Sequence, residues 1–485
     1  MNAVKFVDAQ LYLRNAHTRM PFRFGSTLLL GCPQNVLKLD VVIEGEAVTG
    51  YSAECLIPGW FDKRPRGYEL QIQDQIAAIY HARTAFAERM RAPQPFFPTW
   101  LEVYESTKAF SAETGIPMLV CSFGFSMLER AMLDAIARRH HMSFGEAIRQ
   151  NVYGIDPGAV HAELRGFEPA DWLPADSLTK VALRHTIGLV DPLTRSDAHE
   201  GDPVDDGLPE SLEEYVELYG LRYLKIKLCN DLEADLERLT SIAGIMRRLR
   251  GEDYSVTMDG NEQYSTPAEL MELYERIQLT PALETLWENT LSMEQPINRA
   301  GALSPELSDG IRALAALQPI IIDESDAALD SYPQALAMGY TGTSSKSCKG
   351  AIKSILNAGL TWLRNGKGER TDYIMTAEDL TTAGMIALQG DLALVATLGI
   401  NHVERNGHHY YRGLNYLPEG EQQRILKAHP DLYHAFSGGA AVNIDSGDLN
   451  ITSLQCPGYG FAIEPDLGSY TPADEWEFSS LGIDQ

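Results

Sequence analysis

Charged motifs recur in the middle of the chain, and each follows or ends a short apolar run. They are Lys225-Ile226-Lys227, Asp259-Gly260-Asn261, Glu294-Gln295-Pro296, Asp323-Glu324-Ser325 and Lys346. A helix-like segment separates each motif from the next. A parallel β/α array produces this recurrence when each strand carries one functional residue at its carboxyl end. The spacing therefore predicts a barrel whose rim gathers three carboxylates, with lysines on both sides.

Alternating strand and helix patterns extend over the whole region from residue 181 to residue 403. The pattern predicts strands over Val181–Ile187, Tyr223–Lys227, Ser255–Met258, Trp287–Met293, Ile320–Ile322, Gly342–Ser345, Tyr373–Met375 and His402–Val403. Helices are predicted between them over Leu232–Leu249, Pro267–Arg276, Glu306–Leu317, Tyr332–Met338, Ile352–Asn365 and Met385–Leu398. Eight strands separated by helices fit an α/β fold, a modified TIM barrel that is either (β/α)7β-like or (β/α)8.

The segments that flank the barrel differ from it. Residues 1–155 predict an α+β capping domain, with an antiparallel sheet up to about residue 54 and helices over Gln71–Arg89 and Phe125–Arg139. Residues 156–405 form the predicted barrel. Residues 406–485 are polar and rich in Gly and Pro, and we expect them to pack back on the capping domain. The stretch Asp191–Pro209 is either a long loop above the active site or a surface insertion.

Composition excludes several partners. The net charge of −27 argues against nucleic acid and against an anionic membrane surface. No apolar run approaches the roughly 18 residues that a membrane span needs. The six cysteines are scattered without CxxC spacing, so a cytoplasmic protein with reduced thiols is the simplest interpretation.

Three acids, Asp259, Glu294 and Asp323, are the candidate metal ligands. Hard oxygen ligands of this kind suit Mg²⁺, and also Mn²⁺. Any one of them alone is more simply explained as a helix cap or a surface charge, but three on successive strands favour a metal. Asn261 lies two residues after Asp259, on the same side of an extended chain, and can support the site.

Three lysines are the candidate bases. Lys225 and Lys227 share one strand face, and their mutual repulsion is expected to lower their pKa values toward that of a usable base. The alternative is a solvated pair at a sheet edge. Lys346 follows four strands later and so lies across the barrel. Lysines on opposite sides of a bound carbon acid can remove and return a proton while a divalent ion holds its carboxylate. Lys349 is expected to be structural or adjacent to the substrate.

The ordered motifs resemble the enolase superfamily, in its mandelate racemase and muconate-lactonizing branch with a lysine on the sixth strand. That family runs through KxK, DxN, EQP, DES and a lysine strand followed by KxGG; this chain has KIK, DGN, EQP, DES and SKSCKGA. Residues 22–25 and 50–54 resemble the family's two capping loops, and residues 128–134 resemble a helix of its capping domain. The resemblance covers nearly the whole chain.

The resemblance implies a Mg²⁺-dependent enzyme that removes the proton α to a carboxylate and forms a metal-stabilised enolate. Asp259, Glu294 and Asp323 match the metal ligands, Lys227 and Lys346 the two acid/base groups, and Lys225 their partner. A racemase, epimerase or cycloisomerase is expected. The alternatives are a lyase, acting as a dehydratase or by syn-elimination as in succinylbenzoate synthase, and a non-catalytic barrel that binds a carboxylate. A homo-oligomer and a small carboxylate substrate are also expected.

Departures from the family pattern leave the substrate open. The seventh strand continues as Met375–Leu380 without the histidine of the mandelate racemase group, and Ala351 replaces a glycine. Residues 404–412 are either a substrate-specific cluster or an ordinary surface loop. The residues expected to face the substrate are Asn261, Arg23, Phe24, Glu378 and His408. A phosphoryl-transfer or hydrolase site is disfavoured, because no Gly-rich phosphate loop follows the late strands.

Overall fold

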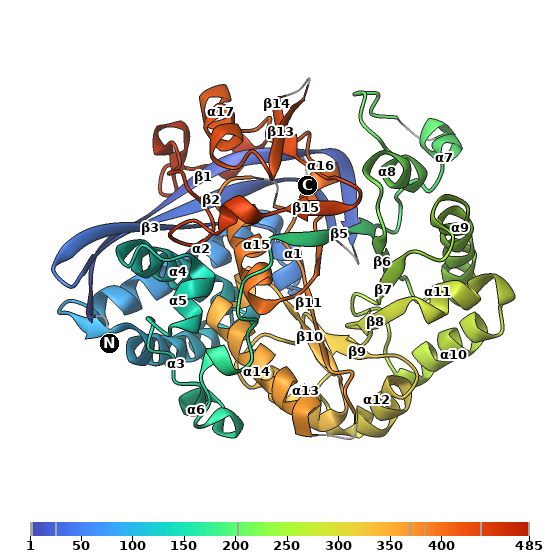
Figure 1. Ribbon diagram of the computed structural model, residues 1–485, viewed down its shortest axis with the longest axis horizontal. Coiled ribbons are helices and arrows are strands. Elements are labelled where there is room, and N and C mark those ends of the chain that lie inside the picture. The colour runs from blue at the N-terminus through green and yellow to red at the C-terminus, as the bar shows by residue number, and fades with distance from the viewer. Residues whose placement is uncertain are drawn as a thin grey trace.

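The computed structural model describes residues 3–24, 27–200, 203–367, 370–382, 384–436 and 439–483. Its two large sheets are a five-stranded antiparallel sheet, in the order β16-β1-β2-β3 with β4 on β1, and a nine-stranded sheet that contains the barrel strands. Figure 1 shows strands β1–β3 and helices α2–α5 beside the barrel, whose outer helices α9 to α13 run around the opposite side. A continuous apolar core extends through both parts.

The N-terminal sheet is built from three long strands, β1 (Ala3–Phe24), β2 (Thr27–Ile43) and β3 (Glu46–Cys55). They pair antiparallel, as the sequence predicts. Its helices are α1 (Pro58–Phe61), α2 (Tyr68–Arg89), α3 (Phe96–Thr114), α4 (Met118–Arg139) and α5 (Phe144–Arg149). Gly50 permits the packing of α4 on β3, because a Cβ there would lie 2.1 Å from the carbonyl oxygen of Ala131.

The eight predicted barrel strands are all present and parallel. They are β5 (Lys180–Ile187), β6 (Tyr223–Lys227), β7 (Ser255–Asp259), β8 (Thr290–Glu294), β9 (Ile320–Ile322), β10 (Gly342–Ser345), β11 (Ile374–Ala377) and β12 (His402–Glu404). They follow the order β11-β10-β9-β8-β7-β6-β5-β12 in one curled sheet. Arg184 of β5 bridges its two ends by donating to the carbonyl oxygen of Ala377 and to the ring of His402.

Helices cover the outside of this sheet. The main ones are α8 (Leu212–Tyr219), α9 (Leu232–Arg250), α10 (Pro267–Gln278), α12 (Ser308–Ala315), α13 (Ser331–Met338), α14 (Ala351–Lys367) and α15 (Ala387–Leu398). Local sequence fixes their ends: the Asp231 side chain accepts a hydrogen bond from the backbone of Ala234 at the start of α9. One predicted boundary is wrong, because Trp287 lies in the short helix α11 (Glu284–Glu288) before β8 and packs on Tyr274.

The C-terminal segment contacts both sheets. The short strand β16 (Thr471–Pro472) pairs with β1, and β15 (Asp448–Asn450) pairs antiparallel with β5. Before β15 along the chain come α16 (Gly407–Tyr410), α17 (Glu419–Ala428) and the hairpin of β13 (Tyr433–Phe436) and β14 (Gly439–Val442). Within the described ranges, no helix combines the length and the apolar character needed to cross a membrane.

The stretch Asp191–Pro209 carries the short helix α7 (Arg195–Glu200) and is tied to the N-terminal sheet. Arg19 of β1 donates to both carboxylate oxygens of Asp206, at 2.7 and 2.6 Å, and to the carbonyl oxygen of Pro209. This part of the loop is therefore packed against the capping sheet.

Candidate active site

The charged motifs meet at the carboxyl ends of the barrel strands, where each side chain is buried. Lys225 and Lys227 come from β6, Asp259 ends β7, Glu294 ends β8 and Glu404 ends β12. Three further residues come directly after a strand: Asp323 follows β9, Lys346 follows β10 and Glu378 follows β11. Because parallel strands place their carboxyl ends at one rim, Lys225 and Glu404, which are 179 positions apart in sequence, become neighbours.

Lys225 is the centre of this cluster. Its ammonium nitrogen lies 3.0 Å from Asp259, 2.8 Å from Glu294, 2.8 Å from Glu378 and 2.9 Å from Glu404. Burial lowers the pKa of Lys225, but these carboxylates outweigh it and raise the pKa well above the ordinary value. The expectation that repulsion between paired lysines lowers this pKa is therefore wrong for Lys225, because four acids surround it.

A second group of cations surrounds Asp323. Lys346 lies 3.2 Å from Asp323 Oδ2 and 2.5 Å from Glu378 Oε2, and Lys349 lies 3.0 Å from Asp323 Oδ1. Burial lowers the pKa of Lys346, yet Asp323 and Glu378 raise it well above its usual range. Lys349 thus holds an acid of the site, in agreement with a structural role.

The acids that could share one metal ion are Glu294, Asp323 and Glu378. One oxygen of each lies within 4.8 Å of the others. Oε2 of Glu294 is buried without a hydrogen-bond partner, which a cation would supply. Burial and then the charge of Glu378 raise the pKa of Glu294 well above its usual range. An oxygen-rich, strongly acidic set with an unpartnered carboxylate oxygen fits Mg²⁺ or Mn²⁺.

Asp259 lies beside this group and is engaged by nitrogen donors. Its Oδ2 is 3.0 Å from Lys225 and 2.6 Å from Lys227, and its Oδ1 accepts the backbone N–H of Asn261 at 2.8 Å. The candidate ligand set of the structure thus contains Glu378 where the sequence motifs indicate Asp259. The two sets share Glu294 and Asp323.

A small cavity of about 40 Å³ lies over these groups. Lys227, Lys346, Asp323 and Asn261 line its barrel side, and Phe22, Ile57, Trp60 and Leu380 line its apolar side. The Lys346 ammonium lies 4.8 Å from the centre of the Trp60 ring. Arg299, in the loop after β8, holds the turn of Trp60 by donating to the carbonyl oxygens of Trp60 and Phe61. The cap and the barrel thus share one site.

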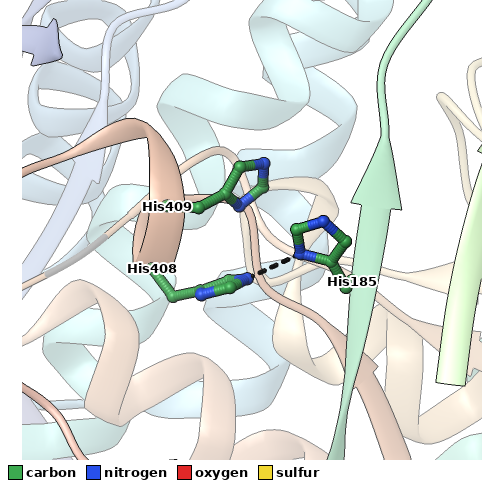
Figure 2. A group of neighbouring side chains, drawn as sticks. All are labelled: His185, His408 and His409. Carbon is green, nitrogen blue, oxygen red and sulfur yellow. Dashed lines mark hydrogen bonds between the residues drawn. The ribbon is translucent and has the colours of Figure 1, made fainter. Parts of the chain in front are cut away.

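The residues expected to face a substrate are distributed unevenly. Asn261 lines the cavity and donates to Glu324 at 3.2 Å, whereas Glu378 lies deeper, among the lysines. The side chain of Arg23 is exposed, and its neighbour Phe22 lines the cavity instead. The side chain of Phe24 is outside the described residues. His408 lies away from the acids, next to His185 and His409 (Figure 2).

Sequence reasoning missed two contributors to the site, Glu404 and Arg184. Glu404 bonds Lys225 from the end of β12, and Arg184 bonds Glu378 at 3.1 Å from inside the barrel. The rule that located the other acids, an acid at the carboxyl end of a barrel strand, also applies to Glu404. Arg184 carries no such signal, because it lies in the middle of β5.

Comparison with known proteins rests on structure alone. No protein-family profile and no curated protein sequence matches the chain. A mandelate racemase/muconate lactonizing protein from Herpetosiphon aurantiacus is similar in structure, with a TM-score of 0.61 and 14% identity over 95% of this chain and 99% of that one. An N-succinyl Arg/Lys racemase from Bacillus cereus has a TM-score of 0.60 and 14% identity, over 96% and 98% of the two chains.

A dipeptide epimerase from Enterococcus faecalis, in complex with Mg and the dipeptide L-Leu-L-Tyr, gives a TM-score of 0.59. It is 12% identical and covers 95% of this chain and 100% of its own. At such identities the likeness establishes the fold alone. This chain therefore has the fold of the mandelate racemase and muconate-lactonizing members of the enolase superfamily.

Proposed function

We propose that the protein is a divalent-metal-dependent enzyme that removes the proton α to a carboxylate, most simply as a racemase or epimerase. The observation that carries this proposal is that two lysines from strands four positions apart, Lys227 on β6 and Lys346 after β10, border one cavity together with an acidic cluster. Racemisation needs one group to remove the proton and another to return it on the opposite side.

The metal would be held by Glu294, Asp323 and Glu378, with Asp259 as the alternative third ligand. When bound, Mg²⁺ supplies positive charge that holds the carboxylate of the substrate and stabilises the negative charge that develops there. In the protein alone, five acids of the site face five cations. The acids are Asp259, Glu294, Asp323, Glu378 and Glu404, and the cations are Lys225, Lys227, Lys346, Lys349 and Arg184. The unassisted cluster is thus nearly balanced, and a divalent ion gives it the net positive charge that an anionic substrate requires.

The lysines have distinct duties in this proposal. Lys346 and Lys227 exchange a proton with the α-carbon from the two sides of the cavity. Lys225 stays protonated, because its carboxylate partners favour the charged form, and it holds the acids in place. Lys346 must act as a neutral amine, so the acids that raise its pKa have to be neutralised by a cation before it can accept a proton.

The cavity lining favours a substrate with two unlike ends. Its floor is charged, whereas the side contributed by the cap is apolar, from Phe22, Ile57 and Trp60. We expect a small carboxylate that carries an apolar group on its α-carbon. The cavity of about 40 Å³ is far smaller than the roughly 300 Å³ of common ligand pockets, so the cap must move aside to admit it.

Isotope exchange tests the reaction. Candidate carboxylates are incubated with the Mg²⁺-loaded enzyme in D₂O, and deuterium at the α-carbon is followed by NMR for each enantiomer. A racemase predicts that Lys346→Ala abolishes exchange from one enantiomer and Lys227→Ala from the other. Lys353→Gln is the matched control, because this buried lysine pairs with Asp326 at 2.8 Å and does not line the cavity.

The same experiment distinguishes a racemase from the second candidate function, a lyase. A lyase that acts by syn-elimination needs one base, so a single lysine variant would abolish exchange from its only substrate, and an unsaturated product would appear in the wild type. A wild-type enzyme that exchanges none of a broad library of carboxylates, with Mg²⁺ bound, would overturn the enzymatic proposal in favour of a carboxylate-binding barrel.

Metal binding is tested separately, with Mn²⁺ as the probe and electron paramagnetic resonance as the readout. Glu294→Gln is expected to lose tight binding, since both candidate ligand sets include it. Glu378→Gln and Asp259→Asn then distinguish the two sets. If Glu294, Asp323 and Glu378 are the ligands, Glu378→Gln should weaken Mn²⁺ binding more than Asp259→Asn does. The reverse order would support Asp259, Glu294 and Asp323 as the ligands.

A further inference from the structure

A cluster of three histidines lies outside the acidic site. His185 is in the middle of β5, and His408 and His409 are consecutive residues of α16. One ring nitrogen of each lies within 4.8 Å of the others. Figure 2 shows the two side chains of α16 projecting toward His185, with a hydrogen bond of 2.9 Å joining His185 Nδ1 to His408 Nε2.

Neighbouring contacts place this cluster on the outer side of the barrel wall. Arg184 and Thr186, on either side of His185 in β5, reach Glu378 and Glu404 inside the barrel. Because side chains alternate along a strand, His185 points the other way. There it packs against Tyr215 of α8, whose ring centre is 4.8 Å away.

The histidines have more nitrogen atoms than hydrogen-bond partners. Neither Nδ1 nor Nε2 of His409 has a partner, and Nδ1 of His408 has none. His409 is only 3% exposed and His185 only 2%. A neutral imidazole offers one donor and one acceptor, and leaving both unused in a buried position is costly. Packing alone therefore does not account for histidine at position 409, whereas a ligand that takes a nitrogen lone pair does.

We propose that His185, His408 and His409 bind one transition-metal ion of the Zn²⁺ class. Imidazole nitrogens without any carboxylate suit Zn²⁺, Ni²⁺ or Cu²⁺ and do not suit Mg²⁺. Burial lowers the pKa values of all three rings, which keeps them in the neutral form that ligates metals. This site does not depend on the reaction proposed for the acidic cluster.

The spacing agrees with such an ion. Two nitrogens that are each 2.0–2.1 Å from a tetrahedral Zn²⁺ lie about 3.4 Å apart. The 2.9 Å between His185 Nδ1 and His408 Nε2 widens to that value with a small ring rotation. Two guanidinium groups act on the histidines. That of Arg19 donates to the carbonyl oxygen of His409 and is paired with Asp206. That of Arg405, whose charge acts on His408, is paired with Asp379 and Asp391, so both charges are compensated.

Solvent can reach the site through His408. This residue is partly exposed and lines a cavity of about 330 Å³, together with Tyr219, Tyr411, Phe436 and Leu414. A fourth ligand, water or a small anion, can therefore approach the ion from the cavity. Three protein nitrogens with one open position are a coordination that proteins use for Zn²⁺.

The ion would also fix the turn that joins the two sites. Asn406, two residues before His408, lines the acidic cavity, and Tyr410 stacks on Phe22 of the cap with ring centres 4.1 Å apart. Coordination of His408 and His409 to His185 attaches this turn to β5. We expect the bound ion to slow amide hydrogen exchange in α16.

The test uses the full-length protein, stripped with a chelator and then saturated with Mg²⁺ so that the acidic cluster is occupied. Zn²⁺ is added, unbound metal is removed by gel filtration, and retained Zn²⁺ is measured by mass spectrometry. Wild type is expected to retain a single Zn²⁺ per chain, and Co²⁺ in its place should give the visible absorption of a tetrahedral site. His409→Gln and His408→Gln should each weaken binding by about 100-fold or more, since losing a ligand exceeds losing an outer partner.

The matched control is His434→Gln, a histidine that lines the same cavity without belonging to the cluster. It should bind Zn²⁺ as the wild type does. Melting temperature in chelator identifies any variant that fails to fold, and Zn²⁺ should raise the melting temperature of wild type and His434→Gln alone. The proposal would be overturned if wild type retained no Zn²⁺ in excess Mg²⁺. It would also be overturned if His408→Gln and His409→Gln retained as much Zn²⁺ as wild type.

Discussion

Trp60 of the capping domain covers Lys346 of the barrel, with the ammonium nitrogen 4.8 Å from the centre of the indole ring. Trp60 is 5% exposed and lies in α1, which Arg299 of the barrel holds in place by hydrogen bonds to two carbonyl oxygens. The cap therefore contributes to the electrostatic surroundings of a lysine that the barrel positions. A cation above an aromatic face is stabilised most when water is excluded, as it is here.

Shortening Trp60 should impair the reaction. The ring stabilises the ammonium that forms when neutral Lys346 accepts the proton. Trp60→Leu removes this contact, worth about 1–2 kcal/mol when desolvated, so the rate of α-proton exchange at low substrate should fall about tenfold. Trp60→Phe keeps a ring and should lose less. Trp362→Phe, at a residue that is 37% exposed on α14, is the control and should match the wild type. Unchanged exchange in Trp60→Leu would contradict a role for this contact.

Replacement of Lys225 should destabilise the protein strongly in the absence of metal. Lys225→Met leaves Asp259, Glu294, Glu378 and Glu404 without their shared cation, and breaking a buried ion pair by removing one partner costs about 3–5 kcal/mol. Urea unfolding with a chelator measures this loss.

Mg²⁺ should recover part of the stability of Lys225→Met, because it supplies positive charge to the same acids. Lys180→Met is the control: this lysine is 63% exposed and pairs with Asp448 at the surface, where an ion pair contributes about 0–1 kcal/mol. A loss in Lys225→Met as small as that in Lys180→Met would show that the acids are neutralised in another way.

The barrel was predictable from sequence because its signal is local and repeated. Each strand is a short apolar run, and acids such as Asp259 and Glu294 follow at the carboxyl end, so the order of motifs alone gives the architecture. The boundary at Trp287 was not predictable, since an apolar run before a strand reads the same whether it is helical or extended.

The residues that make up the site were harder to predict from sequence than the fold. The pKa of Lys225 depends on four acids from β7, β8, β11 and β12, which only the closed sheet brings together. His185 is a single histidine within an apolar strand, and nothing in the sequence relates it to His408 more than 220 positions away. Clusters that combine distant elements need the three-dimensional arrangement.

The pair of Arg19 and Asp206 should hold the loop after β5 against the capping sheet. Their side chains are 5% and 10% exposed and make two hydrogen bonds. A double-mutant cycle with Arg19→Gln and Asp206→Asn should give a coupling free energy of about 1–3 kcal/mol. The exposed pair of Arg195 and Glu217, 52% and 38% exposed, should couple far more weakly, because solvent screens it.

Release of this loop should also be visible to proteases. Arg19→Gln is expected to increase the rate of cleavage within 195–210, because the loop loses its attachment to β1. If cleavage in that stretch stays at the wild-type rate while the coupling is large, the pair stabilises the fold without restraining the loop.

Glu129 should give the protein a measurable pH dependence of stability. It is a buried residue of α4 that accepts hydrogen bonds from Trp100 Nε1 at 2.6 Å and from the backbone N–H of Ala351 at 2.5 Å, at the start of the helix that follows Lys346. Burial raises its pKa from 4.5 to about 7, against the opposing effect of these donors. Between these values the folded state binds more protons than the unfolded state, so stability falls as the pH rises and levels off above about pH 7.

Glu129→Gln removes this titration and provides the measurement. From about pH 5 to about pH 8, the free energy of unfolding of the wild type should fall relative to that of Glu129→Gln by up to about 3 kcal/mol. The control is Glu146→Gln, because the pKa of Glu146 is lowered, first by the backbone N–H of Ser143, and the residue is ionised over this whole range in both states. Its difference from wild type should therefore stay constant with pH. A constant difference for Glu129→Gln as well would mean that the N–H donors of Trp100, Ala351 and Ile352, which favour the ionised carboxylate, outweigh burial, and that Glu129 is charged at neutral pH.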